Sequence, residues 1–289
     1  MKIRLDFIKF CVSGYVDNMS VHPVVIEKLE CFLSELVSKK EILDYNVLTL
    51  SNKVSIILLS DAERFKEKGD VDSIVYGAIE SLEKCECSFA FEKDTLKQFR
   101  NFSFTERKNE SILIFFATNI DVKLHNMRIL NLLFDPFSKV KDFLSNSDLV
   151  FTINLRFGAQ AKSYNQFEEL FELAEEIKRT GSDFYIESVL YQNSQPLMAS
   201  LEDSSVSVWR VSKPYYPLNF ILDILSRDIL PVTFYDTSNV FDFPKSLAIG
   251  FSVQNGKLYG PLDLFDNSFY DYLRTKFYER NYENYKYRR

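Results

Sequence analysis

The stretch SLAIGFSVQNGKLYGPLDLFDNSFYDYLRTKFY, residues 246–278, has the clearest structural pattern in the chain. An apolar run at 246–253 is followed by Asn255-Gly256 and a second short run at 257–259. Asn-Gly favours the tight turn between antiparallel strands, so this pattern predicts a β-hairpin. A Gly-Pro turn and an acidic helix start then lead into a predicted aromatic helix at 267–279.

Strand and helix patterns alternate through the rest of the chain. Apolar alternation and short apolar runs predict strands, and apolar residues at helical spacing predict helices. The predicted strands are 3–12, 45–50, 54–59, 111–117, 149–157, 184–191 and 206–211. The predicted helices are 24–36, 71–82, 125–134, 165–179 and 218–225, while 89–107 shows no clear period. This order predicts an α/β (α+β) fold, with mixed β-sheets layered with helices in a single domain of residues 1–280, before a basic and aromatic tail at 281–289.

Composition narrows the class of protein. The 289 residues are 46% hydrophobic with a net charge of −6, which disfavours a general polyanion-binding role. No apolar run approaches the roughly 20 residues of a membrane span, and the N-terminus has no signal-peptide pattern. Four cysteines suit a reducing compartment, and the close pair Cys85 and Cys87 suits neither a disulfide nor zinc. We expect a soluble, cytoplasmic protein without a membrane partner.

The chain lacks the motifs of several catalytic classes. It contains only two histidines, and it has no glycine-rich dinucleotide motif, no P-loop and no His-Glu-x-x-His pattern. His22 precedes Pro23 at a predicted helix start, and His125 is expected to cap or enter a helix. Both patterns favour structural roles. The acidic residues near predicted element ends, such as Asp121 and Asp263, are more typical of caps and turns than of metal ligands.

The last residues combine aromatic and basic side chains. Tyrosine and arginine are enriched at protein interfaces, so this segment is a candidate interaction surface. An amphipathic helix with a frayed basic end is the alternative. Binding of single-stranded nucleic acid is disfavoured, because the chain is acidic overall. The candidate interface residues are Tyr270, Tyr272, Arg274, Tyr278, Arg280 and Tyr282.

Residues 246–273 resemble the end of the archaeal-type bifunctional fructose-1,6-bisphosphate aldolase/phosphatase family. The matching motifs are Gly250-Phe251, the turn Asn255-Gly256-Lys257-Leu258, and GPLDLFD at 260–266. Gly14-Tyr15, Val21-His22-Pro23, LFDPFS at 133–138 and the strand at 206–210 also agree in order. The resemblance implies an α-β-β-α sandwich that assembles into oligomers.

The functional residues of that family do not carry over. The resemblance implies an Asp where this chain has Cys11, a metal-binding His at Asn18, an Asp-Asp pair at Asn52-Lys53, and Asp-Lys at Thr118-Asn119. The family's Y-x-G-K-D-D motif, which supplies the Schiff-base lysine, is matched by Ala199, Glu202, Asp203 and Ser204. Magnesium needs hard anionic oxygens, and a Schiff base needs a lysine amine.

These replacements predict a pseudoenzyme with no catalytic residues and no metal. We expect it to act as a protein-interaction, scaffold or regulatory subunit without a cofactor, in a homo-oligomer or a hetero-oligomer with another protein. The alternative is a sugar-phosphate phosphatase/aldolase with altered or residual Mg-dependent activity.

Overall fold

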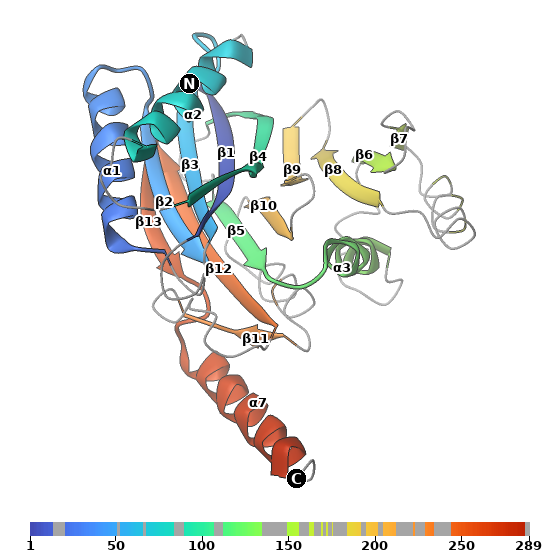
Figure 1. Ribbon diagram of the computed structural model, residues 1–289. Coiled ribbons are helices and arrows are strands. Elements are labelled where there is room, and N and C mark those ends of the chain that lie inside the picture. Colours follow the sequence, from blue (N-terminus) through green and yellow to red (C-terminus); the bar gives the residue numbers. More distant parts are fainter. Residues whose placement is uncertain are drawn as a thin grey trace.

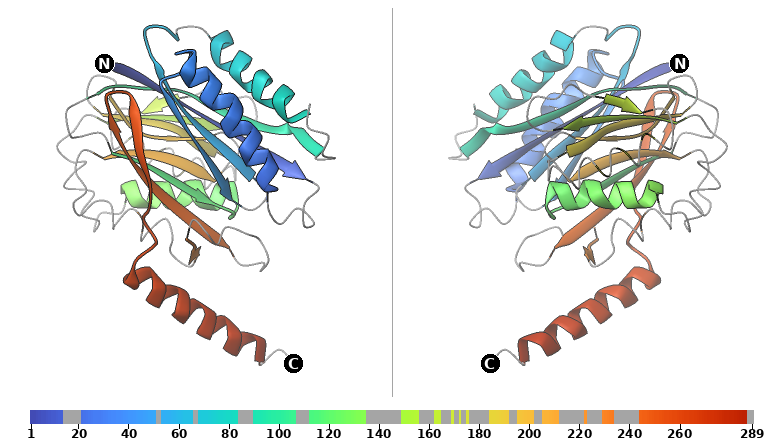
Figure 2. Two further views of the ribbon diagram at one scale, coloured as in Figure 1. Left: turned by 90° about the vertical axis from the view of Figure 1, so that its left-hand side faces the viewer. Right: turned by 90° about the vertical axis from the view of Figure 1, so that its right-hand side faces the viewer.

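A computed structural model shows two β-sheets packed face to face, with helices on both outer faces (Figures 1 and 2). It describes residues 1–13, 21–50, 53–65, 68–83, 90–106, 112–134, 149–155, 162–164, 169, 172, 175, 184–191, 195–201, 205–211, 222, 229–233 and 244–286. Helices α1 and α2 cover the smaller sheet, and α3 lies over the larger one. The predicted α-β-β-α layering of mixed sheets is therefore confirmed.

The smaller sheet contains the N-terminal strands. Its order is β2 (Asp44–Leu50), β3 (Lys53–Asp61), β1 (Lys2–Ser13) and β4 (Ala90–Thr105), and every pair is antiparallel. The predicted pairing of 45–50 with 54–59 is confirmed. Strand β4 occupies the region in which no period was visible in the sequence.

Within the described part of the chain, the larger sheet has nine strands. Its central strand β5 (Ile112–Thr118) is a continuous apolar run, as its position between β12 and β10 requires. The order is β11 (Leu230–Pro231), β12 (Lys245–Gln254), β5, β10 (Val206–Val211), β9 (Gln195–Ser200), β8 (Phe184–Tyr191), β6 (Leu149–Leu155) and β7 (Lys162–Tyr164), with β13 (Lys257–Asp263) paired to β12. Strands β7 and β11, of three and two residues, are too short to have produced a sequence signal, and β9 (QPLMAS) has no clear apolar alternation.

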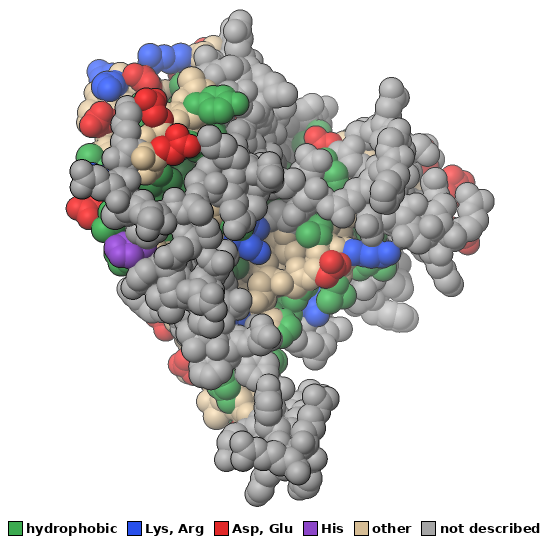
Figure 3. Space-filling view, viewed as in Figure 1, with side chains coloured by type: hydrophobic (Ala, Val, Ile, Leu, Met, Phe, Trp, Pro, Cys, Tyr) green, Lys and Arg blue, Asp and Glu red, His purple; other side chains and the backbone are tan. Residues whose placement is uncertain are grey.

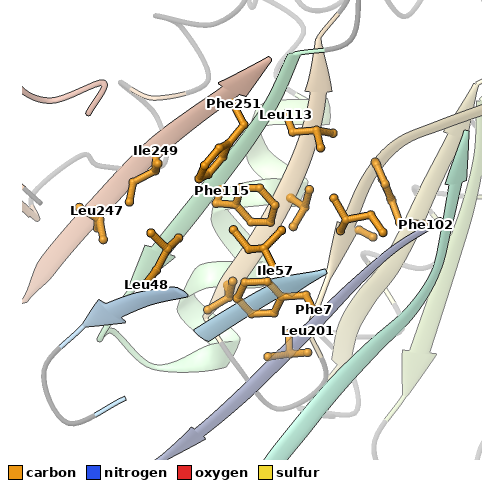
Figure 4. Close-up of a cluster of buried hydrophobic side chains, with 14 of the residues drawn as sticks. Phe7, Leu48, Ile57, Phe102, Leu113, Phe115, Leu201, Leu247, Ile249 and Phe251 are labelled. Carbon is orange, nitrogen blue, oxygen red and sulfur yellow. The ribbon is translucent and has the colours of Figure 1, made fainter. Parts of the chain in front are cut away.

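The main core lies between the two sheets (Figure 4). Phe115 of β5 stacks on Phe7 of β1 at a ring-centroid distance of 5.7 Å and meets Phe251 of β12 edge-on at 5.5 Å. On β1, alternate residues face this core, so that Ile3, Leu5 and Phe7 point toward the second sheet. Their neighbours Ile8 and Phe10 face a second core beneath the helices.

Helix α1 (Pro23–Ser38) begins where the sequence predicts. His22 is its N-cap, because its Nδ1 accepts a hydrogen bond from the Val24 N–H at 3.2 Å, and Pro23 fits the first turn. Helix α2 is Lys68–Glu83, and its neighbour in space is α1. Among the described helices, none combines the length and apolar character that a membrane span requires.

Helix α3 (Val122–Phe134) bears out part of the expectation for His125, which enters this helix but does not cap it. The cap is Asp121, whose Oδ1 accepts hydrogen bonds from the Lys123 and Leu124 N–H groups. His125 lies in the first turn and is fully buried against Phe116 of the larger sheet. The helix begins at Val122 and not at the predicted residue 125, because Asp121 provides the cap.

The C-terminal hairpin has the predicted turn. Asn255 and Gly256 both have positive φ (52° and 71°), the backbone that a two-residue Asn-Gly turn requires. The predicted Gly-Pro turn is wrong, because Gly260 and Pro261 lie within β13, at an irregularity in its pairing with β12. A Cβ on Gly260 would lie 2.9 Å from the Gly250 carbonyl oxygen, so glycine allows this close approach.

Parts of some predicted elements lie outside the described residues. Of the predicted helix at 165–179, Glu169, Glu172 and Glu175 are described, and all three are helical. Leu222 is helical as well, within the predicted helix 218–225. Cys85 and Cys87 are not among the described residues. Helix α7 (Ser268–Lys286) extends the predicted 267–279 helix and continues into the segment 281–286, so the boundary of the 281–289 tail stays a prediction.

Candidate functional site

Cys11 and Lys53 meet at one end of the space between the sheets. They are register partners on β1 and β3, and each continues the alternate row of residues that faces the second sheet. The resemblance implies acidic residues at both positions. A half-buried thiol beside an ammonium group cannot supply the hard anionic oxygens that magnesium prefers.

Lys9 lies one residue pair deeper on the same row. Its cross-strand partner is Ser55, and its side chain is only 8% exposed. Burial, followed by the positive charge of Lys53, lowers the pKa of Lys9 from 10.5 to about 7, and the interaction with Cys11 opposes this shift. Sequence reasoning missed Lys9. The available signal was its place in the alternating row Ile3, Leu5, Phe7, Lys9, where a polar side chain must point inward.

Lys245 brings a third lysine to this end from the opposite sheet. It is 2% exposed, and it continues the row of alternate β12 residues, Leu247 and Ile249, that face the core between the sheets. A cavity of about 20 Å³, room for one water molecule, is lined by Leu50 and Ser55 of the smaller sheet and by Ala117 and Leu247 of the larger one. Beyond the cavity, the next residue on the same face of β3 after Ser55 is Lys53, and the next on the same face of β12 after Leu247 is Lys245.

Thr118 and Asn119 are committed to structural hydrogen bonds. Thr118 Oγ1 donates to the Lys245 carbonyl oxygen at 2.8 Å, and Asn119 Oδ1 accepts from the Lys245 N–H at 2.6 Å. The Asn119 N–H donates in turn to the Lys245 carbonyl oxygen at 3.2 Å. These contacts fasten the end of β5 to the start of β12. The side chains of Thr118 and Asn119 thus hold the backbone of Lys245 in place.

We expect Asn119→Ala to destabilise the protein by about 1 kcal/mol, because it leaves the part-buried Lys245 N–H without its acceptor. Urea unfolding of the two proteins measures this difference. Asn126 offers a matched comparison: its Oδ1 accepts from the Ile186 N–H at 3.1 Å, so Asn126→Ala should cost a similar amount. If Asn119→Ala were neutral while Asn126→Ala was costly, the structural role of Asn119 would be wrong.

The described part of the chain contains no cluster of metal-binding side chains. Among the described residues, no group of three or more His, Cys, Asp or Glu side chains could hold a metal ion. Asn18, Asn52, Glu202, Asp203 and Ser204 lie outside the described residues, so the structure does not place these five predicted positions.

The base of helix α7 contains two of the candidate interface residues. Tyr270 is 4% exposed and packs between the rings of Phe265 and Phe269, at centroid distances of 4.6 and 5.1 Å. Arg274 donates to the carbonyl oxygens of Pro231 and Phe265, at 3.1 Å each, and pairs with Asp271. Tyr270 and Arg274 therefore attach α7 to the body and are not on its outer surface.

The outer surface of α7 carries the other aromatic residues. Phe269, Tyr272 and Tyr278 are 54%, 59% and 41% exposed. Helical spacing places Phe269, Tyr272, Lys276 and Arg280 along one side of α7, which we call the α7 stripe, and Tyr278 on the opposite side. The helix projects away from the sheets (Figures 1 and 2). The side chains of Arg280 and Tyr282 are not described.

Comparison with known proteins shows which proteins this chain is similar to. A family model described as fructose-1,6-bisphosphatase matches residues 225–285, which include the hairpin and most of α7. The fructose-1,6-bisphosphate aldolase/phosphatase of Thermococcus kodakarensis is 22% identical, over 95% of this chain and 87% of that protein. The proteins of the same name from Metallosphaera sedula and Moorella thermoacetica are each 23% identical, over 95% and 94% of this chain and 83% of each relative.

A solved structure of an unknown protein from Galdieria sulphuraria aligns with 64% of this chain and 97% of its own, at 10% identity and a TM-score of 0.19, which carries no argument about the fold. The alignments with the named relatives span nearly the whole chain, and the motifs at 250–266 lie inside the segment that the family model matches. The chain is therefore similar, over nearly its whole length, to fructose-1,6-bisphosphate aldolase/phosphatases.

Proposed function

We propose that this protein is a pseudoenzyme of its family that acts by binding protein, through the α7 stripe. The observation that carries the loss of catalysis is the register pair of Cys11 with Lys53. An ammonium group at this position repels the cations that a Mg-dependent site would gather.

A direct assay separates this proposal from residual sugar-phosphate chemistry, which the names of the relatives favour. With magnesium present, we expect no phosphate release from fructose 1,6-bisphosphate and no condensation of triose phosphates. We also expect no magnesium-dependent shift in melting temperature. The Thermococcus kodakarensis relative serves as the positive control. Magnesium-dependent turnover by this chain would overturn the proposal.

The partner that best fits the α7 stripe is a second copy of this chain. The stripe begins with Phe269 and Tyr272 and continues with the positions of Lys276 and Arg280. In an antiparallel pair of α7 helices, the aromatic half of each stripe would face the basic half of the other. Cations over aromatic faces attract, and a twofold pairing satisfies both halves at once. Lys276 already lies 5.7 Å from the centre of the Tyr272 ring within one chain.

The charges around the stripe support the same pairing. Residues 263–271 contain three Asp and no Lys or Arg, whereas residues 272–289 contain six Lys or Arg and two Glu. Antiparallel helices would therefore bring an acidic start against a basic end. A helix that projects from the body also gains little stability from its own chain, so a partner would help to order it.

Light scattering and sedimentation test this pairing. We expect a dimer or larger oligomer, and the double variant Phe269→Ser/Tyr272→Ser should weaken association about tenfold or more. Tyr76→Ser is the matched control, because Tyr76 is 68% exposed on α2, far from α7 in Figure 1. A strict monomer would overturn self-pairing. If that monomer captured a different protein through α7, the stripe would be a hetero-oligomeric surface instead.

A further inference from the structure

Polar side chains hold the start of helix α3 against the larger sheet. His125 and Asn126 are neighbours in its first turn, and both are fully buried. Asn126 Oδ1 accepts a hydrogen bond from the Ile186 N–H of β8 at 3.1 Å, and its Nδ2 donates to the Val122 carbonyl oxygen at 2.8 Å. Strand β9 pairs with β8 over residues 188–191, so beyond that range Asn126 supplies the acceptor for Ile186. The Ile186 amide therefore reports whether α3 is docked.

His125 docks as an aromatic ring. It lies parallel to Phe116 of β5 at a centroid distance of 5.9 Å, and neither ring nitrogen has a hydrogen-bond partner among the described residues. A neutral imidazole carries one N–H donor, whereas an imidazolium carries two donors and a charge. Burying that charge with both donors unsatisfied is costly. The docked helix thus accepts the neutral ring and opposes the protonated one.

The charged groups near His125 favour the same state. Arg128 of α3 and Lys9 of β1 both act on it as positive charges, and burial is the larger cause of the lowered pKa. On the sheet beneath the ring, the residues paired with Phe116 on β10 and β12 are a serine and an alanine, which carry no charge. The remaining described charged side chains of α3 and β8, with the cap of α3, are at the surface: Asp121, Lys123 and Glu187.

We propose that α3 is an acid-sensitive lid on the larger sheet, whose first turn is released when His125 takes up a proton while the two sheets stay folded. The outer side of this turn faces solvent, because Leu124 and Met127 are 47% and 36% exposed. At the position of α3 in Figure 3, hydrophobic and charged side chains are both visible at the surface. The turn can therefore move outward. Ile129 and Leu130, one turn later, are buried and apolar, so a proton on His125 leaves their packing in place.

Release would change the surface that the protein presents. Phe116 and Ile186, which have no exposed area when α3 is docked, would be uncovered beside Leu124 and Met127. The protein would then offer an apolar surface on the larger sheet in acid and withdraw it at neutral pH. This device does not involve α7, so it holds or fails independently of the α7 stripe.

The size of the effect follows from proton binding. In the released turn, His125 is in water and titrates near its ordinary pKa of 6.5, whereas in the docked turn its pKa is about 3. Between these values, the equilibrium constant for release should rise about tenfold for each unit by which the pH falls. From pH 7.5 to pH 5, the rise should be about 30-fold.

Native-state hydrogen exchange at the Ile186 amide tests the lid. After correction for the intrinsic pH dependence of exchange, its protection should fall about 30-fold between pH 7.5 and pH 5. Low concentrations of urea should change this exchange little, because a local opening exposes little surface. The Phe7 amide, in the middle of a strand paired on both sides, should exchange faster with urea. An equal urea dependence at Ile186 and Phe7 would show that the opening is global, which would overturn the proposal.

Variants assign the opening to His125. In His125→Phe the ring is kept and cannot take up a proton, so the protection of Ile186 should be the same at both pH values. His125→Leu is a second variant with the same expectation, should the phenylalanine not be accommodated. His22→Asn is the matched control: it removes the other histidine, at the start of α1, and should show the full 30-fold fall. Protection of Ile186 that does not change with pH in the unchanged protein, or that still falls in His125→Phe and His125→Leu, would also overturn the proposal.

Discussion

Replacing Lys9 with Met should make the protein more stable at pH 7 and should abolish a rise in stability that the unchanged protein shows at higher pH. Lys9 is 8% exposed on an inward-facing row of β1, and its pKa is lowered from 10.5 to about 7 by burial and by Lys53. Met keeps the length of the side chain and suits a buried position. The gain comes from removing an ammonium group that folding transfers out of water.

The sign follows from proton binding in the two states. Between pH 7 and pH 10.5, Lys9 is largely deprotonated when folded and protonated when unfolded. The unfolded state then binds more protons, so the free energy of unfolding rises with pH by up to ~1.4 kcal/mol per unit. The full effect is on the order of 5 kcal/mol, and it is absent below pH 7, where both states carry the proton.

Urea unfolding at a series of pH values from 7 to 10 measures this effect. The unchanged protein should gain stability across the series, and Lys9→Met should show a flatter profile that starts from a higher value. Lys257→Met controls for loss of a lysine that is already in water. Parallel pH profiles for the unchanged protein and Lys9→Met would contradict the buried, deprotonated state of Lys9.

The layers of the fold can be predicted from the sequence because strands and helices bury apolar residues at different spacings along the chain. The run at 112–118 is apolar on both faces, and its position in the middle of the larger sheet follows from that. The turn at Asn255-Gly256 needs only two residues to specify it. Strand β4 could not be predicted, because its sequence mixes aromatic and charged residues and its pairing with β1 contains two irregularities.

The candidate site could be predicted only in part, for a related reason. Cys11 and Lys53 can be identified from the sequence, because they align with functional positions of the resembled family. Lys9 and Lys245 belong to no motif, and their importance depends on which face of each strand is buried. Tyr270 and Tyr272 are the same residue type two positions apart, but Tyr270 is buried and Tyr272 is exposed. Tyr270 is the buried one because α7 packs it against Phe265.

His125 should make the protein sensitive to acid, and His125→Phe should remove that sensitivity. The imidazole is fully buried, lies parallel to the ring of Phe116 at 5.9 Å, and has no hydrogen-bond partner on either nitrogen among the described residues. Burial, followed by the charges of Arg128 and Lys9, lowers its pKa from 6.5 to about 3. Folding therefore requires the neutral ring, and phenylalanine offers a ring that cannot take up a proton.

The expected loss of stability lies between pH 6.5 and pH 3, where the unfolded histidine is protonated and the folded one is not. Stability from this group is complete above pH 6.5 and falls by up to ~1.4 kcal/mol per unit as the pH drops, or about 2 kcal/mol at pH 5. His125→Phe should match the unchanged protein or exceed it at pH 7.5, since the two unpaired ring nitrogens are removed. At pH 5, the advantage of His125→Phe over the unchanged protein should be larger than at pH 7.5 by about 2 kcal/mol.

Chemical unfolding at pH 7.5 and at pH 5 gives the comparison directly, because the difference between the two pH values cancels any packing change that Phe introduces. His22→Asn is the control, since it removes the other histidine but keeps a side-chain acceptor at the start of α1. His22→Asn should still lose stability between pH 7.5 and pH 5, which would identify His125 as the source of that loss. An equal loss between the two pH values in His125→Phe would place the acid sensitivity on the carboxylates of the protein instead.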